Sequence, residues 1–203
     1  MISHKQSLAH LSNADPVMAG IIRRVKIKLL KPRTDHFYSL VRAIVNQQLS
    51  GKAADTILDR FVTLFPGKKF PAPDDILKMS NKKLRSAGLS FQKISYIKNL
   101  SSAVKNGQLN FSKLKKMDDE EIIIALTEIK GIGRWTAEMF LMFSLNRPNV
   151  FSVGDLGLRN GLKKLYKLDA KRHHRKLEKL LSLWHPHKTL ASRHLWASLE
   201  FGD

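Results

Sequence analysis

The stretch "IKGIGRWTAEMFLMFSLNRPNVFSVGDLGLRNGL", residues 129–162, contains two glycines one residue apart, an apolar run and an aspartate after a further glycine. A helix is expected to end at Ile129, and a new one to begin at about Arg134. Gly131 and Gly133 lie in the tight turn between them, where glycine permits positive φ and a close approach of the backbone. Because the unpaired N–H groups at a helix start favour an anion, this turn is a candidate phosphate-binding site. An ordinary helix–helix turn has the same pattern.

The charge of the chain favours a polyanionic partner. Among 203 residues, Lys and Arg total 36 and Asp and Glu 17, which gives a formal net charge of +19. Basic residues run along the whole chain, and no apolar run approaches the roughly 20 residues of a membrane span. Nucleic acid is therefore favoured over a membrane surface, and Lys130 and Arg134 beside the glycine turn strengthen the phosphate interpretation. A generally adhesive or ribosome-associated basic protein would carry the same charge.

Cysteine and histidine usage restricts the chemistry. The chain has no Cys, which excludes disulfides, a cysteine nucleophile, cysteine-ligated zinc and iron–sulfur clusters. Its eight His show no metal-ligand spacing, so no zinc site is expected. We also expect that no cofactor is required. Residues 1–16 lack the apolar core of a signal peptide. An intracellular location is expected, in the cytoplasm or nucleoid of a prokaryote or the nucleus of a eukaryote.

Helical periodicity dominates the sequence, and strand alternation is hard to find. Helical segments are expected over residues 17–25, 37–45, 53–65, 91–106, 118–129, 134–145, 156–166 and 170–201. The stretch 65–75 is rich in Pro and Gly, so we expect it and the short helices after it to separate an N-terminal lobe from the glycine turn. The sequence predicts an all-α protein in which residues 1–203 form one unit of two helical lobes with a cleft between them.

The wording "IKGIGRWTAEMF...FSVGDLGLR" resembles the helix-hairpin-helix DNA glycosylase superfamily, in which the hairpin is followed by a Gly/Pro-rich loop and an Asp. It is most similar to the 3-methyladenine DNA glycosylase II family, which acts in alkylation repair. The similarity covers about Phe37 to the C-terminus, and its motif region spans about residues 118–166. The resemblance implies a two-lobed glycosylase fold, base flipping and base excision repair.

Asp155 is the candidate catalytic residue. By position it is also a candidate N-cap for the helix that follows, a common role of Asp, and the two roles are compatible. N-glycosidic cleavage develops positive charge on the deoxyribose, which a fixed carboxylate stabilises while it orients or deprotonates the attacking water. The resemblance assigns this role to Asp155. The acidic cluster at residues 118–121 is expected to be a solvated helix start.

Two of the three tryptophans bear on the reaction and the base pocket. In superfamily members that also cut the DNA backbone, a Lys that forms a Schiff base follows the second hairpin glycine by two residues. Trp135 stands there and has no nucleophile, so the resemblance implies an enzyme without AP lyase activity. Trp135 and Trp196 match positions where the family places aromatics against the extruded base, and indole faces attract a cationic base. Met139 is a further candidate pocket residue, whereas Trp184 is expected in the core.

The stretch "AIVNQQLSGKAAD", residues 43–55, resembles the family's loop that enters the minor groove. Leu49 is the candidate wedge that fills the gap left by the extruded nucleotide. Gln47, Gln48 and Ser50 are candidates for polar contacts with neighbouring bases. The alternative is a plain turn in which Ser50 caps the next helix and Leu49 packs inside.

The resemblance also implies that backbone carbonyls of the hairpin hold a monovalent cation, Na⁺ or K⁺, at Thr127, Ile129 and Ile132. The expected partner is double-stranded DNA containing alkylated bases, bound by a monomer and not at a membrane. Two alternatives remain open. A glycosylase for oxidised or mismatched bases is disfavoured by Trp135 and the absence of Cys, and a non-catalytic helix-hairpin-helix DNA-binding module is disfavoured by Asp155.

Overall fold

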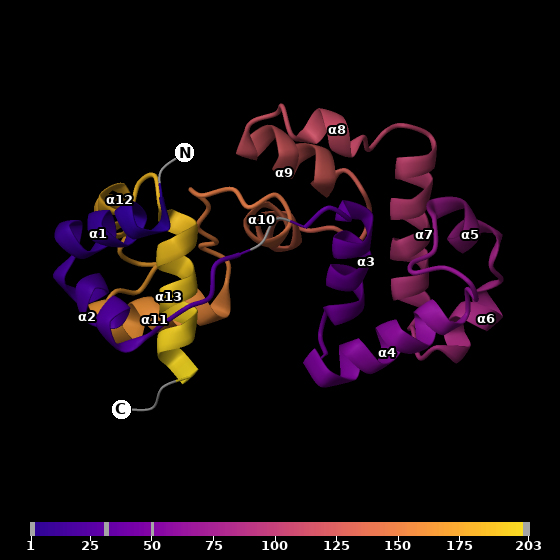
Figure 1. The fold of residues 1–203 in the computed structure, drawn as a ribbon, viewed down its shortest axis with the longest axis horizontal. Helices are drawn as coiled ribbons and strands as arrows, with labels where there is room; N and C mark the ends of the chain where they lie inside the picture. Colours follow the sequence, from indigo (N-terminus) through magenta and orange to yellow (C-terminus); the bar gives the residue numbers. More distant parts are fainter. Residues whose placement is uncertain (1–2, 31–32, 50, 201–203) are drawn as a thin grey trace. The chain divides into compact units, whose positions relative to one another are not determined.

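The computed structural model describes residues 3–30, 33–49 and 51–200, and within these ranges it is helical without any strand, as predicted (Figure 1). The chain divides into two compact units. The first unit comprises residues 1–32 and 141–203, and the second comprises residues 33–140. Among the described helices, none is both long and apolar enough to cross a membrane.

The first unit joins the two ends of the chain. Packing of α2 against α13, and of α11 against α13, brings N-terminal and C-terminal helices together around a core that includes Leu11, Leu162 and Leu195. The helix α1 was not among the predicted segments, although Ser3 and Gln6 form a capping box at its start. The helices of this unit are α1 (His4–Ala14), α2 (Pro16–Arg24), α11 (Leu156–Tyr166), α12 (His174–Leu183) and α13 (Lys188–Glu200).

Asp15 is a buried carboxylate that ties three helices of the first unit together. It caps α2 by accepting the backbone N–H of Val17 at 2.9 Å. Its Oδ2 accepts the hydroxyl of Tyr166 at 2.7 Å and the indole N–H of Trp184 at 2.8 Å. Trp184 is fully buried, which confirms its predicted place in the core.

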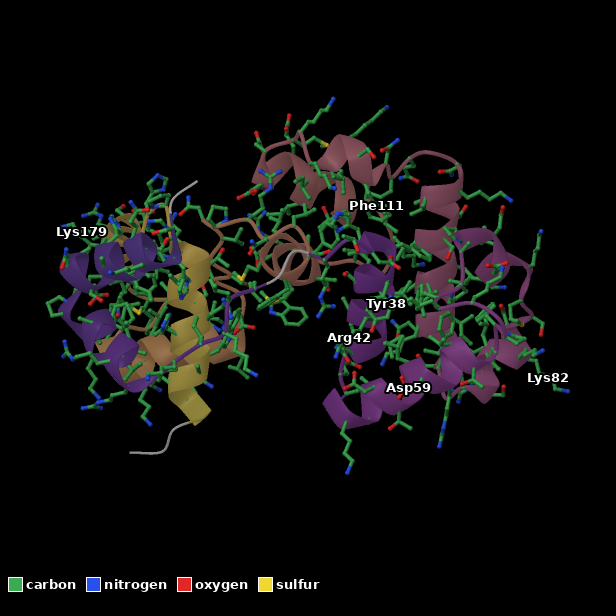
Figure 2. The ribbon with its side chains drawn as sticks, viewed as in Figure 1. Tyr38, Arg42, Asp59, Lys82, Phe111 and Lys179 are labelled. Carbon is green, nitrogen blue, oxygen red and sulfur yellow. The ribbon has the colours of Figure 1, made fainter. Side chains whose placement is uncertain are left out.

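The second unit is built around α7, which packs on α3, α5 and α6. An aromatic cluster fills its interior, and Tyr38 meets Phe70 edge-on with ring centroids 4.9 Å apart. Charged side chains such as Lys82 extend from the helix surfaces (Figure 2). The helices of this unit are α3 (His36–Asn46), α4 (Gly51–Thr63), α5 (Pro73–Lys78), α6 (Asn81–Ser86), α7 (Phe91–Lys105), α8 (Phe111–Leu114), α9 (Asp119–Thr127) and most of α10 (Arg134–Phe143).

The predicted division between the lobes was wrong. Residues 65–75 lie inside the second unit, where Phe70 packs into the aromatic cluster instead of linking two lobes. The boundaries fall between residues 32 and 33 and, within α10, between residues 140 and 141. The predicted motif region, residues 118–166, is therefore shared by both units. Local composition gave no sign of this, because the boundary inside α10 carries no Pro or Gly.

The predicted helix over residues 170–201 is interrupted. It consists of α12 and α13, separated by the residues around Pro186. Proline lacks a backbone N–H and its ring clashes with the preceding turn, so a helix does not continue through it. The break allows α13 to run along α11 as a separate element.

Candidate functional site

Asp155 is held in place by two hydrogen bonds to one carboxylate oxygen. It is the N-cap of α11, and its Oδ1 accepts the backbone N–H of Leu158 at 2.8 Å. The same atom accepts the indole N–H of Trp196, also at 2.8 Å. The predicted capping role is confirmed, and a second donor from α13 fixes the side-chain direction. Two donors on Oδ1 give a carboxylate of defined orientation at a helix start, where a negative charge is favoured.

Trp196 is half-buried beside this carboxylate. The Phe143 ring lies next to it, with centroids 5.8 Å apart and planes inclined by 33°. Phe143, at the end of α10, was not among the predicted site residues, because an aromatic in an apolar helix is indistinguishable from core by sequence. The first unit thus assembles a carboxylate and two aromatic rings.

The hairpin turn, residues 128–133 between α9 and α10, uses its two glycines differently. Gly131 has a φ of +110°, and a Cβ there would lie 2.2 Å from Cγ of Tyr96. Both the backbone conformation and the packing therefore require glycine. Gly133 does not have a positive φ, and a Cβ there would meet nothing within 4 Å. Internal packing gives no reason for glycine at 133, and the backbone there is exposed.

Side chains from the loop after α3 and from α7 support the hairpin turn. Gln47 donates its amide N–H to the carbonyl of Gly131 at 2.9 Å, and Asn99 donates to the carbonyl of Lys130 at 3.3 Å. Gln47 was predicted to contact bases; in this structure its amide joins the loop after α3 to the hairpin turn. Lys130 is exposed, as a phosphate contact requires.

Arg134, predicted to contact DNA, forms ion pairs within the second unit. Its guanidinium donates to both carboxylate oxygens of Glu120, at 2.7 and 2.8 Å, and its Nε donates to Glu138 at 3.2 Å. The bond to Glu120 raises the pKa of Arg134, and the same bond lowers the pKa of Glu120. Glu120 lies in the first turn of α9, so the acidic cluster is a helix start, as predicted. One of its members also anchors the start of α10.

The loop after α3 leaves its apolar residue accessible. Leu49 is 38% exposed, so the alternative in which it packs inside the protein is wrong. Gln48 has a φ of +57°, in the left-handed region, and Ser50 lies outside the described residues. The ammonium group of Lys93 donates to the carbonyl of Val45 at 2.7 Å, near the end of α3. Burial lowers the pKa of Lys93.

The remaining predicted residues lie on α10, at the end of α9 and in the hairpin turn. Trp135 is 45% exposed and Met139 is partly buried one turn later. The carbonyl of Ile129 accepts the backbone N–H of Ile132 at 3.0 Å, and the Thr127 hydroxyl donates to the carbonyl of Ile123 at 2.9 Å. Of the three carbonyls predicted to hold a cation, that of Ile129 thus already accepts a hydrogen bond within the turn.

Residues 41–186 match the family described as "HhH-GPD superfamily base excision DNA repair protein". This match includes the hairpin turn and Asp155. The chain belongs to the HhH-GPD superfamily. The helix-hairpin-helix superfamily predicted from the sequence is thereby confirmed.

Individual HhH-GPD proteins resemble the chain over almost its whole length. DNA-3-methyladenine glycosylase 1 of Schizosaccharomyces pombe is 33% identical over 198 residues, which are 96% of this chain and 87% of that protein. The crystal structure of a Bacillus halodurans DNA-3-methyladenine glycosidase matches with a TM-score of 0.84 and 38% identity, over 97% of this chain and 90% of that one. The S. pombe 3-methyladenine DNA glycosylase Mag1, in complex with abasic DNA, matches with a TM-score of 0.85 and 31% identity, over 97% of this chain and 98% of that one.

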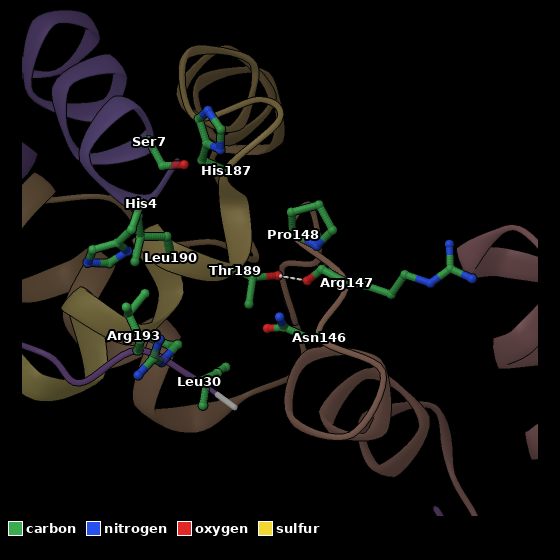
Figure 3. A pocket seen from close by; sticks show the side chains of 11 residues that line it. His4, Ser7, Leu30, Asn146, Arg147, Pro148, His187, Thr189, Leu190 and Arg193 are labelled. Atoms are coloured by element: carbon green, nitrogen blue, oxygen red, sulfur yellow. Dashed lines mark hydrogen bonds between the residues drawn. The ribbon is translucent and has the colours of Figure 1, made fainter. Parts of the chain in front are cut away.

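A separate pocket of about 190 Å³ lies in the first unit of this HhH-GPD protein (Figure 3). It is bordered by α1, α13 and the segment at residues 146–148, where Thr189 donates its hydroxyl to the carbonyl of Arg147 at 2.6 Å. None of the predicted site residues lines it. It is therefore distinct from the arrangement around Asp155.

Proposed function

We propose that this HhH-GPD protein is a monofunctional DNA glycosylase of the 3-methyladenine DNA glycosylase II type. It extrudes alkylated purines such as 3-methyladenine from double-stranded DNA and hydrolyses their N-glycosidic bond, which initiates base excision repair. The names of the similar proteins support the substrate class. The observation that carries the proposal is the Asp155 carboxylate, oriented by Leu158 and by an indole from another helix.

The reaction breaks the bond between the deoxyribose C1′ and the base nitrogen, and the electron pair leaves with the base. Positive charge develops on the sugar, and a preorganised carboxylate at Asp155 stabilises it without having to reorient. Water then adds to C1′ and loses a proton, for which Asp155 is the acceptor. The product is an intact strand with an abasic site.

From the resemblance to the glycosylase family, Trp196, Trp135 and Met139 are each proposed to contact the extruded base. The indole N–H of Trp196 is already donated to Asp155, so what Trp196 offers a base is its ring face. A purine alkylated at a ring nitrogen carries positive charge, which is attracted by the indole face by about 0.5–2 kcal/mol. Both the ring and the adjacent carboxylate thus favour a cationic lesion.

Binding of DNA is proposed to use the hairpin turn and the loop after α3. The exposed backbone at Gly133 admits a phosphate without a side chain in the way, and Lys130 adds positive charge. Arg134 is also proposed to contact DNA, although its ion pairs with Glu120 and Glu138 offset its charge in this structure. Leu49 is proposed to enter the base stack, and Gln48 and Ser50 are proposed to make polar contacts with neighbouring bases. The hydrogen bond from Gln47 to the Gly131 carbonyl supports a role in holding the loop, in addition to any base contact.

Release of bases from methylated DNA tests the proposed substrate. Duplex DNA treated with a methylating agent is incubated with the protein, and released bases are separated by chromatography. We expect 3-methyladenine and other alkylated purines in the supernatant. Release of oxidised or mismatched bases alone would favour a glycosylase specific for those bases. Binding of DNA without release of any base would favour a non-catalytic DNA-binding module.

The absence of lyase activity is proposed from Trp135, which offers no amine for a Schiff base. Borohydride added during turnover should trap no covalent complex between protein and DNA, and strands should break only on later treatment with alkali. A trapped adduct would overturn the monofunctional assignment.

We further propose that the protein acts as a monomer within the cell, in the cytoplasm or nucleoid of a prokaryote or the nucleus of a eukaryote, and requires no cofactor.

A monovalent cation is proposed at the hairpin turn, because the carbonyl oxygens of Thr127, Ile129 and Ile132 are hard ligands that suit Na⁺ or K⁺. A bound cation would offset the partial negative charge of the hairpin carbonyls, which would otherwise repel a nearby phosphate. Higher thermal stability in KCl or NaCl than in choline chloride of equal ionic strength is expected, and equal stability would contradict the cation site.

A further inference from the structure

Gly157 lies in the first turn of α11, two residues after Asp155, and its missing side chain leaves room for Trp196. A Cβ at position 157 would lie 2.9 Å from both Cδ1 and Nε1 of the indole, and 3.1 Å from Oδ1 of Asp155. Non-bonded carbon atoms pack at about 3.5–4.0 Å. Any side chain at 157 would therefore overlap the ring and crowd the carboxylate oxygen that it contacts.

The indole has few directions in which to yield. The ring of Phe143 lies beside it, and α13, which carries Trp196, packs directly on α11. Its N–H is also directed at Asp155 by the 2.8 Å hydrogen bond. Relief of an overlap at 157 would thus move the indole away from the carboxylate or shift the start of α11 that positions Asp155.

Gly161, one helical turn later, provides an internal comparison. A Cβ there would lie 3.5 Å and 3.6 Å from side-chain atoms of Leu195, which is ordinary van der Waals contact. Glycine is a weak helix former at both positions, so helix propensity explains neither. Packing requires glycine at 157 and does not require it at 161.

We propose that Gly157 is a positioning residue for the glycosylase reaction: it keeps open the space in which the Trp196 indole reaches Asp155. This inference rests on the proposed function, because it takes Asp155 as the catalytic carboxylate. With the indole in that space, Oδ1 receives both the Leu158 N–H and the Trp196 N–H, and the carboxylate holds one orientation before DNA binds. If the indole is displaced, Oδ1 loses the hydrogen bond from Trp196 and, of these two hydrogen bonds, keeps the one from the Leu158 N–H.

The test compares Gly157→Ala with Gly161→Ala, which make the same chemical change on the same helix. In ¹⁵N-labelled protein, the indole N–H resonance of Trp196 reports the hydrogen bond to Asp155. We expect this resonance to shift in Gly157→Ala, and single-turnover base release to fall at least tenfold. Affinity for a duplex containing an abasic site should change less than twofold. Gly161→Ala should leave both resonance and rate close to those of the parent.

A second comparison removes the ring. In a Trp196→Leu background the overlap with the indole no longer exists and only the 3.1 Å contact with Asp155 Oδ1 remains, so adding Gly157→Ala should cause a much smaller further loss of rate than in the parent. This distinguishes a clash with the indole from a general disturbance of α11, which would lower the rate in either background. An equal loss in both backgrounds would overturn the proposal, even if Gly157→Ala in the parent were poorly folded.

The proposal and the function on which it rests fail in different ways. If Asp155→Asn abolishes base release but Gly157→Ala changes neither the indole resonance nor the rate, the positioning role is wrong and the proposed function stands. If Asp155→Asn retains full base release, the proposed catalytic role of Asp155 is itself wrong, whatever Gly157→Ala does.

Discussion

The indole N–H of Trp196 and the backbone N–H of Leu158 both donate to Oδ1 of Asp155, each at 2.8 Å. One donor comes from the helix that Asp155 caps and the other from α13. Asp155, which the sequence predicts to be a helix cap, is therefore also held by a residue outside its own helix. Such restraint is what a carboxylate needs if it is to stabilise a developing charge without reorganisation.

Replacement of Asp155 by Asn should lower base release by roughly 100-fold or more, because the negative charge beside the cationic sugar is lost. Asparagine also caps helices and can accept the same two hydrogen bonds, so the fold and DNA affinity should be retained. Single-turnover release from methylated DNA, with circular dichroism and DNA binding as controls, measures these effects. Near-parent activity would contradict the catalytic assignment.

Substitution of the two hairpin glycines should affect different properties: stability at Gly131 and DNA affinity at Gly133. Gly131→Ala places a Cβ against Tyr96 at a positive φ, so the free energy of unfolding should fall by about 1–3 kcal/mol. Gly133→Asp has room for its side chain but brings a negative charge to the proposed phosphate site. Its thermal stability should stay near the parent value, while duplex affinity falls by about tenfold or more.

Salt titration of duplex binding tests the contribution of phosphate contacts to affinity. The logarithm of the parent's affinity for duplex DNA should fall linearly with the logarithm of salt concentration, because bound phosphates release counterions. If Gly133→Asp binds duplex DNA as tightly as the parent, the hairpin turn is not the anchor. Parent-like stability of Gly131→Ala would mean that Tyr96 moves aside.

Trp196 should contribute to selectivity for charged lesions. Trp196→Leu removes the ring face, so affinity for a cationic abasic-site mimic should fall more than affinity for a neutral one. Trp196→Phe keeps a π face and loses the donor to Asp155, and should retain part of this preference. Binding constants for the two mimics provide the measurement. Equal losses for both mimics in Trp196→Leu would show that the ring supplies shape or packing only.

Acidification should destabilise the protein through buried histidines. Burial lowers the pKa of His194 below its ordinary value of 6.5, and the charges of Arg193 and His4 lower it further. The unfolded chain therefore binds a proton more readily than the folded one, and the free energy of unfolding falls as the pH drops from 6.5 through the lower native pKa. Urea unfolding at pH 7.5 and 5.5 should show this loss.

The contribution of His194 can be isolated with His194→Gln, which does not titrate. The pH dependence of stability should become shallower in this variant but not vanish, because burial also lowers the pKa of His36 and His187. An unchanged slope between parent and variant would exclude His194 as a source.

Local signals in the sequence determined the helical class, the caps and the position of the hairpin turn. Asp155 before an apolar helix predicts an N-cap because a short acceptor side chain reaches the free N–H groups of the first turn. The glycine spacing likewise marks the turn before Arg134. These features depend on residues within a few positions of one another, so periodicity and capping chemistry suffice. The identity of the enzyme class followed from the resemblance carried by the same motif.

Only the tertiary structure decided which distant residues meet. Trp196 contacts Asp155 across 41 positions, and Gln47 contacts Gly131 across 84. Nothing near Gly157 in the sequence shows that an indole occupies the space of its missing side chain. The N-terminal helices join the C-terminal ones, and a boundary falls inside α10. Such contacts arise when amphipathic helices bury their apolar faces together, and which faces pair depends on the packing of the whole unit instead of on any local pattern.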